Sequence, residues 1–234
     1  MPNRQPGGIG KERIAEIPVT SALIGLNVLL FLAELGFGGS IGSGTGGTLV
    51  ADGGLFGPAV DSGEYYRLFT SGFLHAGLMH IGFNMLMLFV LGSMLEPAVG
   101  SLKFAALYVA TLFCGALGAL VLDPNSYTVG ASGAIFGLMG AGVLIMYAEG
   151  VNPWKSGLGA TIALNLVLSL LIPGVSIGGH VGGLIGGLII GAVIAQTIRS
   201  KNSTAIALAT CVAVGGIAVV AALAIVAGSS TPTF

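Results

Sequence analysis

The chain has 234 residues, of which 54% are hydrophobic and 7% are charged, with a mean hydropathy of +0.99 and a formal net charge of −1. Soluble domains carry about 25% charged residues, so this composition excludes an ordinary water-soluble domain and predicts a polytopic membrane protein. The near-neutral charge and the lack of a basic run argue against a nucleic-acid partner. The 41 glycines lie mostly within apolar runs, where small residues let membrane helices pack closely.

Seven apolar runs follow one another along the chain, and each is predicted to form a membrane helix. Six of them reach about 17–25 residues, the length that a helix needs to cross the hydrocarbon core. The seven runs span residues 19–35, 76–95, 102–122, 131–148, 158–172, 177–198 and 204–227. The run 158–172 is the short one and stops at Pro173. The predicted fold class is therefore all-α, a bundle of transmembrane helices.

The chain is predicted to consist of a short cytoplasmic segment at residues 1–18, a six-helix core at 19–200, and an additional C-terminal helix and tail at 201–234. The first run is interpreted as a retained helix, because no convincing signal-peptide cleavage site accompanies it. The longest connection, residues 36–72, is rich in Gly but also contains aromatic and Leu residues. A loop of this length is more often functional, or embedded at the membrane interface, than idle.

The positions of the basic residues predict the orientation in the membrane. With the N-terminus in the cytoplasm, only Arg67 of the 8 basic residues falls on the outer side. The basic residues that fall inside are Arg4, Lys11, Arg13, Lys103, Lys155, Arg199 and Lys201. Seven helices then place the C-terminus outside and the start of the fourth helix at the extracytoplasmic end.

Ser132 lies at the predicted start of the fourth helix, within the sequence Gly-Ala-Ser-Gly. Polar side chains inside a membrane helix are costly and indicate a functional site. Gly130 and Gly133 let another backbone approach the hydroxyl, and the free N–H groups of a helix start suit a developing oxyanion. From this motif alone, the alternative is a serine that caps the helix.

His180 is the second candidate, at the outer end of the sixth helix. Glycines at positions 179, 183, 187 and 191 form a strip without side chains along one face of this helix. The fourth helix has a comparable pair, Gly133 and Gly137, and two such faces pack closely in lipid. This packing is predicted to bring His180 to Ser132 as base and nucleophile. The alternative for His180 is a helix cap or an interface residue.

His80 and Asn84 lie four residues apart on the second helix and therefore share a face. An imidazole and a carboxamide on one face of an apolar helix can donate hydrogen bonds to an oxyanion. Alternatively, Asn84 bonds a neighbouring helix. His75 is interpreted as an interface residue beside the site. Together, a nucleophile, a base and two donors predict a hydrolytic serine site.

These motifs resemble, in order and spacing, those of the rhomboid intramembrane serine proteases, from about residue 66 to residue 191. Gly-x-Ser-Gly is weakly specific by itself, whereas the full set in this order is highly specific. The matching residues are Tyr66 and Arg67 in the first loop, His75, His80 and Asn84 on the second helix, Gly130, Ser132 and Gly133 at the nucleophile, and His180, Gly183 and Gly187 at the base.

The resemblance implies a six-helix core around a water-filled cavity, and hydrolysis of the transmembrane segments of other membrane proteins. It implies that Ser132 is the nucleophile and that His180 is the general base and later the general acid. It also implies an oxyanion hole made of His80, Asn84 and the Ser132 backbone N–H. Phe136 stands where many members have a Tyr packed against the base, so the ring is kept but its hydroxyl is lost. The seventh helix resembles one that some members add at the C-terminal end.

An acidic third member of a catalytic triad is not apparent, because no carboxylate belongs to these motifs. Asp123 comes nearest, in the loop before Ser132, and is interpreted as a loop residue, which leaves packing to orient the imidazole. No metal and no other cofactor is expected, since the histidines are split between two helices without clustered carboxylates. Cys114 and Cys211 lack metal-ligand or redox spacing and are interpreted as small core residues.

Two other functions stay open. A catalytically silent rhomboid-like protein would bind or dislocate membrane clients, although such proteins typically lack the serine or the histidine. A small transporter would also place polar groups in the membrane, but it would favour an inverted repeat, which the sequence does not display. For a protease, the predicted partners are transmembrane protein substrates and membrane lipids. The predicted location is a prokaryotic cell membrane, and the oligomeric state is left open.

Overall fold

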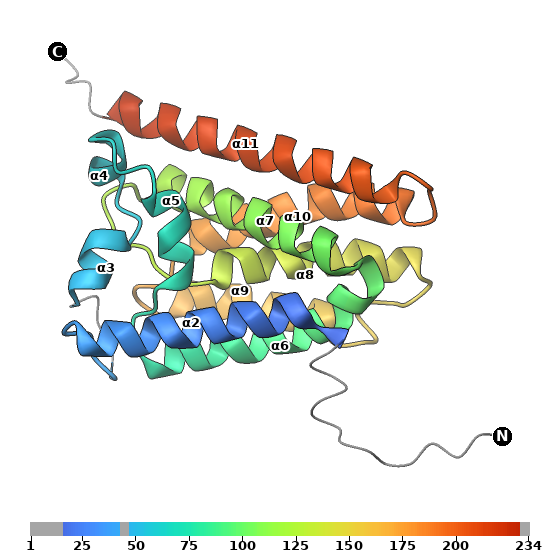
Figure 1. Ribbon diagram of the computed structural model, residues 1–234, viewed down its shortest axis with the longest axis horizontal. Helices are drawn as coiled ribbons and strands as arrows, with labels where there is room; N and C mark the ends of the chain where they lie inside the picture. The colour runs from blue at the N-terminus through green and yellow to red at the C-terminus, as the bar shows by residue number, and fades with distance from the viewer. Residues whose placement is uncertain (1–15, 43–46, 230–234) are drawn as a thin grey trace.

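The computed structural model describes residues 16–42 and 47–229, which form a bundle of helices (Figure 1). The elements in chain order are α2 (Pro18–Gly36), α3 (Thr48–Gly53), α4 (Gly57–Asp61), α5 (Arg67–Thr70), η1 (Ser71–Phe73), α6 (Leu78–Val99), α7 (Ser101–Leu122), α8 (Ser132–Ala148), α9 (Leu158–Leu171), α10 (Ile177–Thr197) and α11 (Ser203–Ser229). Most of the predicted cytoplasmic segment, with Arg4, Lys11 and Arg13, lies outside the described residues, as does the end of the predicted tail.

All seven predicted membrane helices are present, as α2 and α6 to α11, and this confirms the all-α membrane fold. Within the described residues, five of these helices are long and apolar enough to cross a membrane. The other two, α8 and α9, are apolar but shorter, with 17 and 14 residues. The protein is therefore a multi-pass membrane protein.

The helix α6 extends further than the sequence predicted, because it continues through Glu96 to Val99 instead of ending at residue 95. The Glu96 carboxylate is buried but paired. It accepts hydrogen bonds from the N–H groups of Val19 and Thr20, from Thr20 Oγ1 and from Ser101 Oγ, at 2.6–2.9 Å. Because the first N–H groups of a helix lack partners within it, Glu96 satisfies the start of α2 and joins it to α6 and α7.

The helices α7, α8 and α10 lie between α11 on one side and α2 and α6 on the other (Figure 1), and glycines set how closely they approach. A Cβ atom on Gly183 would overlap the carbonyl oxygen of Gly133, and one on Gly187 would overlap that of Gly137. The glycine strip of α10 therefore lies against α8, the contact that its spacing predicts. Three further glycines face α7: a Cβ atom on Gly178 or Gly182 would overlap a backbone carbonyl oxygen of α7, and one on Gly186 would overlap the Cys114 side chain. Thus α10 has two faces without side chains, whereas the sequence predicted one.

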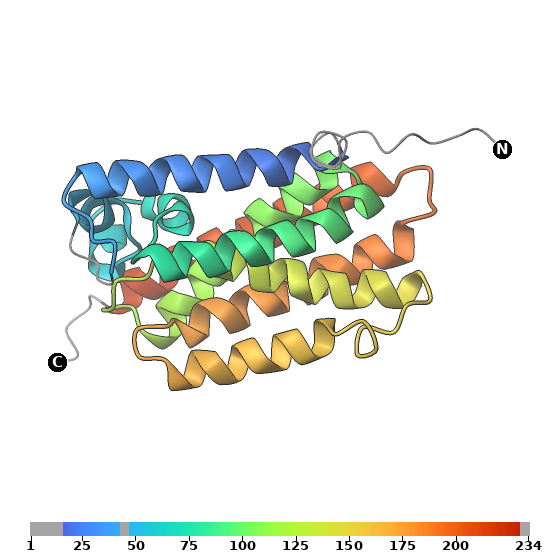
Figure 2. The same cartoon turned by 90° about the horizontal axis from the view of Figure 1, so that it is seen from below.

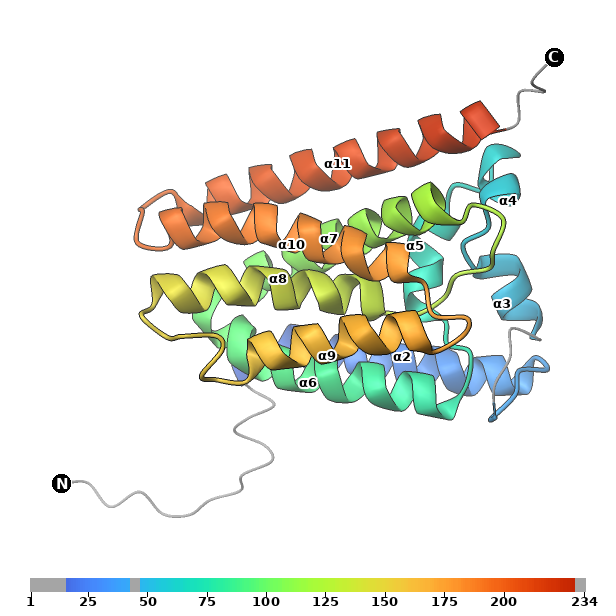
Figure 3. The same ribbon diagram turned by 180° about the vertical axis from the view of Figure 1, so that it is seen from behind.

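The outer helices α2, α9 and α11 lie on different sides of the central helices α7, α8 and α10. As seen from below, α2 and α9 lie at opposite edges of the bundle (Figure 2). Seen from behind, α9 lies on the face of the bundle that is turned to the viewer (Figure 3), and it packs against α8 and α10. The additional helix α11 packs against α7 and α10. Cys114 on α7 and Cys211 on α11 are both free and buried, in keeping with their interpretation as small core residues.

The long connection between α2 and α6 folds into α3, α4, α5 and η1 at one end of the bundle (Figure 1). Arg67 is buried within it and donates hydrogen bonds to the Glu64 carboxylate and to the carbonyl oxygens of Ala51 and Gly54, at 2.7–2.8 Å. Hydrogen bonds from Tyr66 and Arg67 hold the pKa of Glu64 below its ordinary value. The buried arginine thereby holds together backbone segments that are distant in the loop.

This folded loop is attached to the segment that precedes α8. Leu55 and Thr128 exchange two backbone hydrogen bonds as an antiparallel bridge, at 2.9 and 3.0 Å. The Gly130 N–H donates to the Ser71 carbonyl oxygen at 2.9 Å. The first loop therefore helps to position the backbone that leads into Ser132.

Candidate active site

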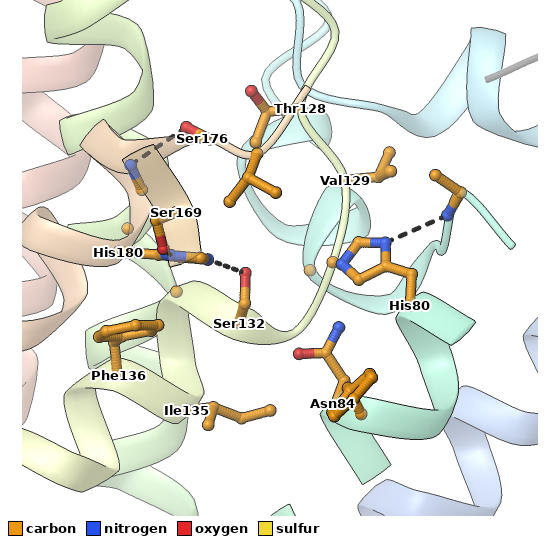
Figure 4. A pocket seen from close by; sticks show the side chains of 18 of the residues that line it. His80, Asn84, Thr128, Val129, Ser132, Ile135, Phe136, Ser169, Ser176 and His180 are labelled. Carbon is orange, nitrogen blue, oxygen red and sulfur yellow. Dashed lines mark hydrogen bonds between the residues drawn. The ribbon is translucent and has the colours of Figure 1, made fainter. Parts of the chain in front are cut away.

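A cavity of about 520 Å³ lies between the first loop, α6, α8, α9 and α10. Polar side chains from four helices line it (Figure 4), and the chain brings them together from distant positions. They include His80 and Asn84 from α6, Ser132 from α8, Asn165 and Ser169 from α9, and His180 from α10.

Ser132 is the first residue of α8, and the cap position before it belongs to Ala131, whose side chain forms no cap. The alternative that Ser132 caps the helix is therefore wrong. The preceding Gly130 has a φ of +124°, and a Cβ atom there would lie 2.6 Å from His80 Nε2. Only glycine combines this backbone conformation with so close an approach of the imidazole.

His180 lies in the first turn of α10, with its Nε2 atom 2.8 Å from Ser132 Oγ (Figure 4). The ring of Phe136 stacks on the imidazole, with 4.2 Å between centroids and an interplanar angle of 16°. The cap of α10 is Ser176, whose hydroxyl accepts the Gly179 N–H at 3.1 Å. The alternative that His180 caps its helix is therefore wrong, as is the interface alternative, because the side chain is buried.

His80 and Asn84 lie across the cavity from His180, on the shared face of α6 (Figure 4). His80 Nδ1 accepts the N–H of Ala76 at 3.3 Å. The Asn84 Nδ2 atom is buried without a hydrogen-bond partner among the described residues. Both side chains thus keep at least one nitrogen available at the cavity.

The interpretation of His75 as an interface residue is wrong. Its side chain is 2% exposed and packs edge-on against the ring of His80, with centroids 5.1 Å apart. Its backbone N–H donates to the carboxylate of Glu34, at 3.1 and 3.3 Å to the two oxygens. Burial follows because Glu34 on α2 holds the segment before α6 inside the bundle, which hydropathy alone does not indicate.

The rhomboid domain model matches residues 62–197, which is more than half of the chain. This protein belongs to the rhomboid family. Rhomboid protease GluP of Bacillus subtilis is 35% identical over 154 residues, covering 65% of this chain and 28% of GluP. The putative rhomboid protease YdcA of the same organism is 43% identical over 82 residues, covering 35% of this chain and 41% of YdcA. Rhomboid-type serine protease 2 of Emericella nidulans is 33% identical over 124 residues, covering 50% of this chain and 24% of the relative. This rhomboid chain thus spans less than half of the length of each of these relatives.

Ser169 is a polar residue of the cavity of this rhomboid protein that the sequence motifs did not predict. Ser169 Oγ lies 2.5 Å from His180 Nδ1, the ring nitrogen that faces away from Ser132. Asp123, the nearest acidic residue before Ser132, is exposed and bonds Ser126 within its own loop. One signal could have revealed Ser169, namely that Asn165 and Ser169 are polar residues four positions apart in an otherwise apolar run.

Proposed function

We propose that this rhomboid protein is an intramembrane serine endopeptidase, which hydrolyses peptide bonds in or near the transmembrane segments of other membrane proteins. The observation that carries the proposal is the 2.8 Å distance between Ser132 Oγ and His180 Nε2 inside a cavity of the helix bundle. A hydroxyl within hydrogen-bond reach of an imidazole is the arrangement that nucleophilic acyl transfer needs. Relatives named as rhomboid or serine proteases support the same reaction.

In the proposed reaction, Ser132 Oγ attacks the carbonyl carbon of the scissile peptide while His180 Nε2 takes the hydroxyl proton. A tetrahedral intermediate forms, with negative charge on the former carbonyl oxygen. His180 then gives the proton to the departing amine, which leaves an acyl ester on Ser132. The same imidazole activates a water molecule that hydrolyses the ester and restores the serine.

The oxyanion of this intermediate is proposed to accept hydrogen bonds from His80, Asn84 and the Ser132 backbone N–H. Because His80 Nδ1 accepts a backbone N–H, the neutral ring carries its proton on Nε2, the nitrogen beside Gly130. Asn84 Nδ2 is a buried donor that has no hydrogen-bond partner in the part of the chain that the structure describes. Buried donors are rarely left unpaired, so this free donor favours a negative charge that forms there only during the reaction.

The oxyanion assignment predicts a fall in turnover with little change in KM when either donor is removed. A single lost donor lowers turnover by about 100- to 1,000-fold, and we expect His80→Ala in that range. Asn84→Ala is expected to be milder, because His80 and the Ser132 N–H remain. His75→Ala is expected to affect turnover least, because the His75 side chain packs against His80 but does not line the cavity. Steady-state kinetics of the three variants in one lipid mixture check this, and a rise in KM at unchanged turnover would reassign His80 and Asn84 to substrate docking.

A membrane-embedded substrate is supported by where the cavity reaches the surface. Four exposed apolar side chains line the cavity: Met79 and Phe83 of α6, Leu168 of α9, and Ile172 just after α9. Exposed apolar side chains on a membrane bundle face lipid. The cavity therefore borders the lipid-facing surface, from which an apolar segment could enter.

The proposed activity is tested with purified protein in liposomes and a model single-pass substrate. We expect cleavage in or near the substrate's transmembrane segment, with the site located by mass spectrometry. A fluorophosphonate, which reacts with activated serines, is expected to label the peptide that contains Ser132. Substrate binding without cleavage or labelling would favour the client-binding alternative, and solute flux without cleavage would favour a transporter.

We also propose that the protein lies in a cell membrane with its N-terminus in the cytoplasm and its C-terminus outside. The start of α2 and the end of α11 lie at opposite ends of the bundle (Figure 1). The connections that carry Lys155, Arg199 and Lys201 lie at the end where α2 starts, and Lys103 is at the start of α7 there. Reporter fusions at the two termini are expected to locate them on opposite sides. Both termini on one side would contradict a count of seven spans.

A further inference from the structure

Both ring nitrogens of His180 have a serine hydroxyl as neighbour. Nε2 lies 2.8 Å from Ser132 Oγ, and Nδ1 lies 2.5 Å from Ser169 Oγ. A neutral imidazole carries one proton, so one of its nitrogens donates and the other accepts. Ser132 can lose its proton to His180 only if Nε2 is the accepting nitrogen. The hydrogen bond at Nδ1 therefore determines whether His180 Nε2 can accept the proton of Ser132.

The other hydrogen bond of Ser169 determines whether His180 Nδ1 donates to the Ser169 hydroxyl or accepts from it. The hydroxyl of Ser169 lies 2.6 Å from the carbonyl oxygen of Asn165, one turn earlier on α9, and donates to it. A carbonyl oxygen can only accept, and a serine hydroxyl has a single proton. With that proton directed to Asn165, Ser169 Oγ offers a lone pair to its other neighbour, His180 Nδ1. The matching imidazole is the one with its proton on Nδ1.

We propose that Ser169 is the positioning residue of the catalytic base: it accepts the Nδ1–H of His180 and leaves Nε2 free to take the proton of Ser132. The proposal rests on the proposed protease function. The three hydrogen bonds are then donated in one direction: Ser132 donates to His180 Nε2, His180 Nδ1–H donates to Ser169 Oγ, and Ser169 donates to the Asn165 carbonyl oxygen. A neutral hydroxyl occupies the place that a carboxylate takes in a serine protease triad.

The packing of α9 supports this role. Only Leu158, Gly159 and Ser169 of this helix are buried, and the next two residues after Ser169, Leu170 and Leu171, are 71% and 70% exposed. Ser169 is therefore the buried residue in the outer half of α9, and its side chain contacts the base. The position of α9 consequently bears on the orientation of His180.

The stacked ring of Phe136 cannot replace this hydrogen bond. Stacking fixes the plane of the imidazole at an angle of 16° and a centroid distance of 4.2 Å. It leaves open a half-turn of the imidazole about its Cβ–Cγ bond, which returns the ring to the same plane but places a carbon where Nε2 faces Ser132. It also leaves open which nitrogen carries the proton. Ser169 distinguishes these states because only the productive one donates an N–H to it.

Kinetics test the proposal through Ser169→Ala, with Ser169→Thr as the conservative variant. We expect Ser169→Ala to lower turnover about 10- to 100-fold at unchanged KM, less than the roughly 10⁴-fold expected for a triad carboxylate, because a neutral group is lost. Fluorophosphonate labelling, which needs no peptide substrate, is expected to slow in parallel. Ser169→Thr is expected to restore most of the rate, because a threonine hydroxyl can also bond the preceding carbonyl in a helix.

A matched control lies on the same helix. The hydroxyl of Thr161 donates to the Gly157 carbonyl oxygen at 3.0 Å, the same kind of bond that Ser169 makes to Asn165, but away from the cavity. Thr161→Val is expected to keep wild-type turnover. Equal losses in Thr161→Val and Ser169→Ala would overturn the proposal, because both would then reflect the stability of α9.

The proton position itself can be observed by nitrogen-15 NMR of histidine-labelled protein, with His180→Ala to assign the signal. The wild type is expected to have the Nδ1–H ring, and Ser169→Ala a mixture of both neutral forms. An Nε2–H ring in the wild type would overturn the proposal. This readout needs no catalysis.

A wild type that neither cleaves nor labels would refute the protease function, whereas active protein with wild-type rates in Ser169→Ala would refute the positioning role alone.

Discussion

Ser132→Ala and His180→Ala are each expected to abolish cleavage while the protein still folds and inserts into the membrane. The first change removes the attacking oxygen, and the second removes the ring nitrogen 2.8 Å from it. Loss of either member of such a pair lowers turnover by about 10⁴-fold or more. Because the two side chains act as a unit, the double variant is expected to be no slower than either single variant. Single-turnover cleavage in liposomes measures the rates, and thermal unfolding in detergent verifies the fold.

A matched serine control is available outside the cavity. Ser62 is exposed in the first loop, and its hydroxyl donates to the Ala59 carbonyl oxygen at 2.8 Å. Ser62→Ala is expected to cleave and to react with a fluorophosphonate at the wild-type rate, whereas Ser132→Ala is expected to remain unlabelled. Wild-type turnover in purified Ser132→Ala or His180→Ala would remove these two residues from the reaction.

Gly183→Val is expected to lose both activity and stability. A Cβ atom at this position would overlap the carbonyl oxygen of Gly133, the residue after the nucleophile, so α8 and α10 must separate. Overpacking a close contact destabilises a protein by about 1–3 kcal/mol or more. The same separation moves His180 away from Ser132, and a misplacement near 1 Å lowers the rate by about 100-fold. Cleavage rates and unfolding temperatures of the variant measure the two effects.

The control for this variant is the same substitution where there is room for it. A Cβ atom on Gly216 of α11 would meet no other atom within 4 Å, so Gly216→Val is expected to be active and close to wild type in stability. His180→Ala separates the two effects of Gly183→Val, because it is expected to lose activity alone. A Gly183→Val variant as stable and active as wild type would mean that the contact between α8 and α10 tolerates a side chain.

The sequence predicted the helices well because each is a local property of the chain. Whether a run of 17–25 residues can cross a membrane depends on its own composition, and so all seven runs reappear as helices. The glycine strip of α10 could be predicted for the same reason, because its four-residue spacing lies within a single helix. The end of α6 could not be predicted, because the buried Glu96 carboxylate depends on hydrogen-bond donors from α2 and α7.

The sequence by itself determined the membrane class, the order of the helices, and which side chains could act as nucleophile, base and oxyanion donors. Only the tertiary structure decided which atoms meet: that Ser132 and His180, 48 residues apart, approach to 2.8 Å, that His75 is buried, and that Ser169 contacts the base. The physical reason is that a hydrogen bond depends on tenths of an ångström and on direction. Those quantities follow from how α8, α9 and α10 pack together, and no single helix contains them.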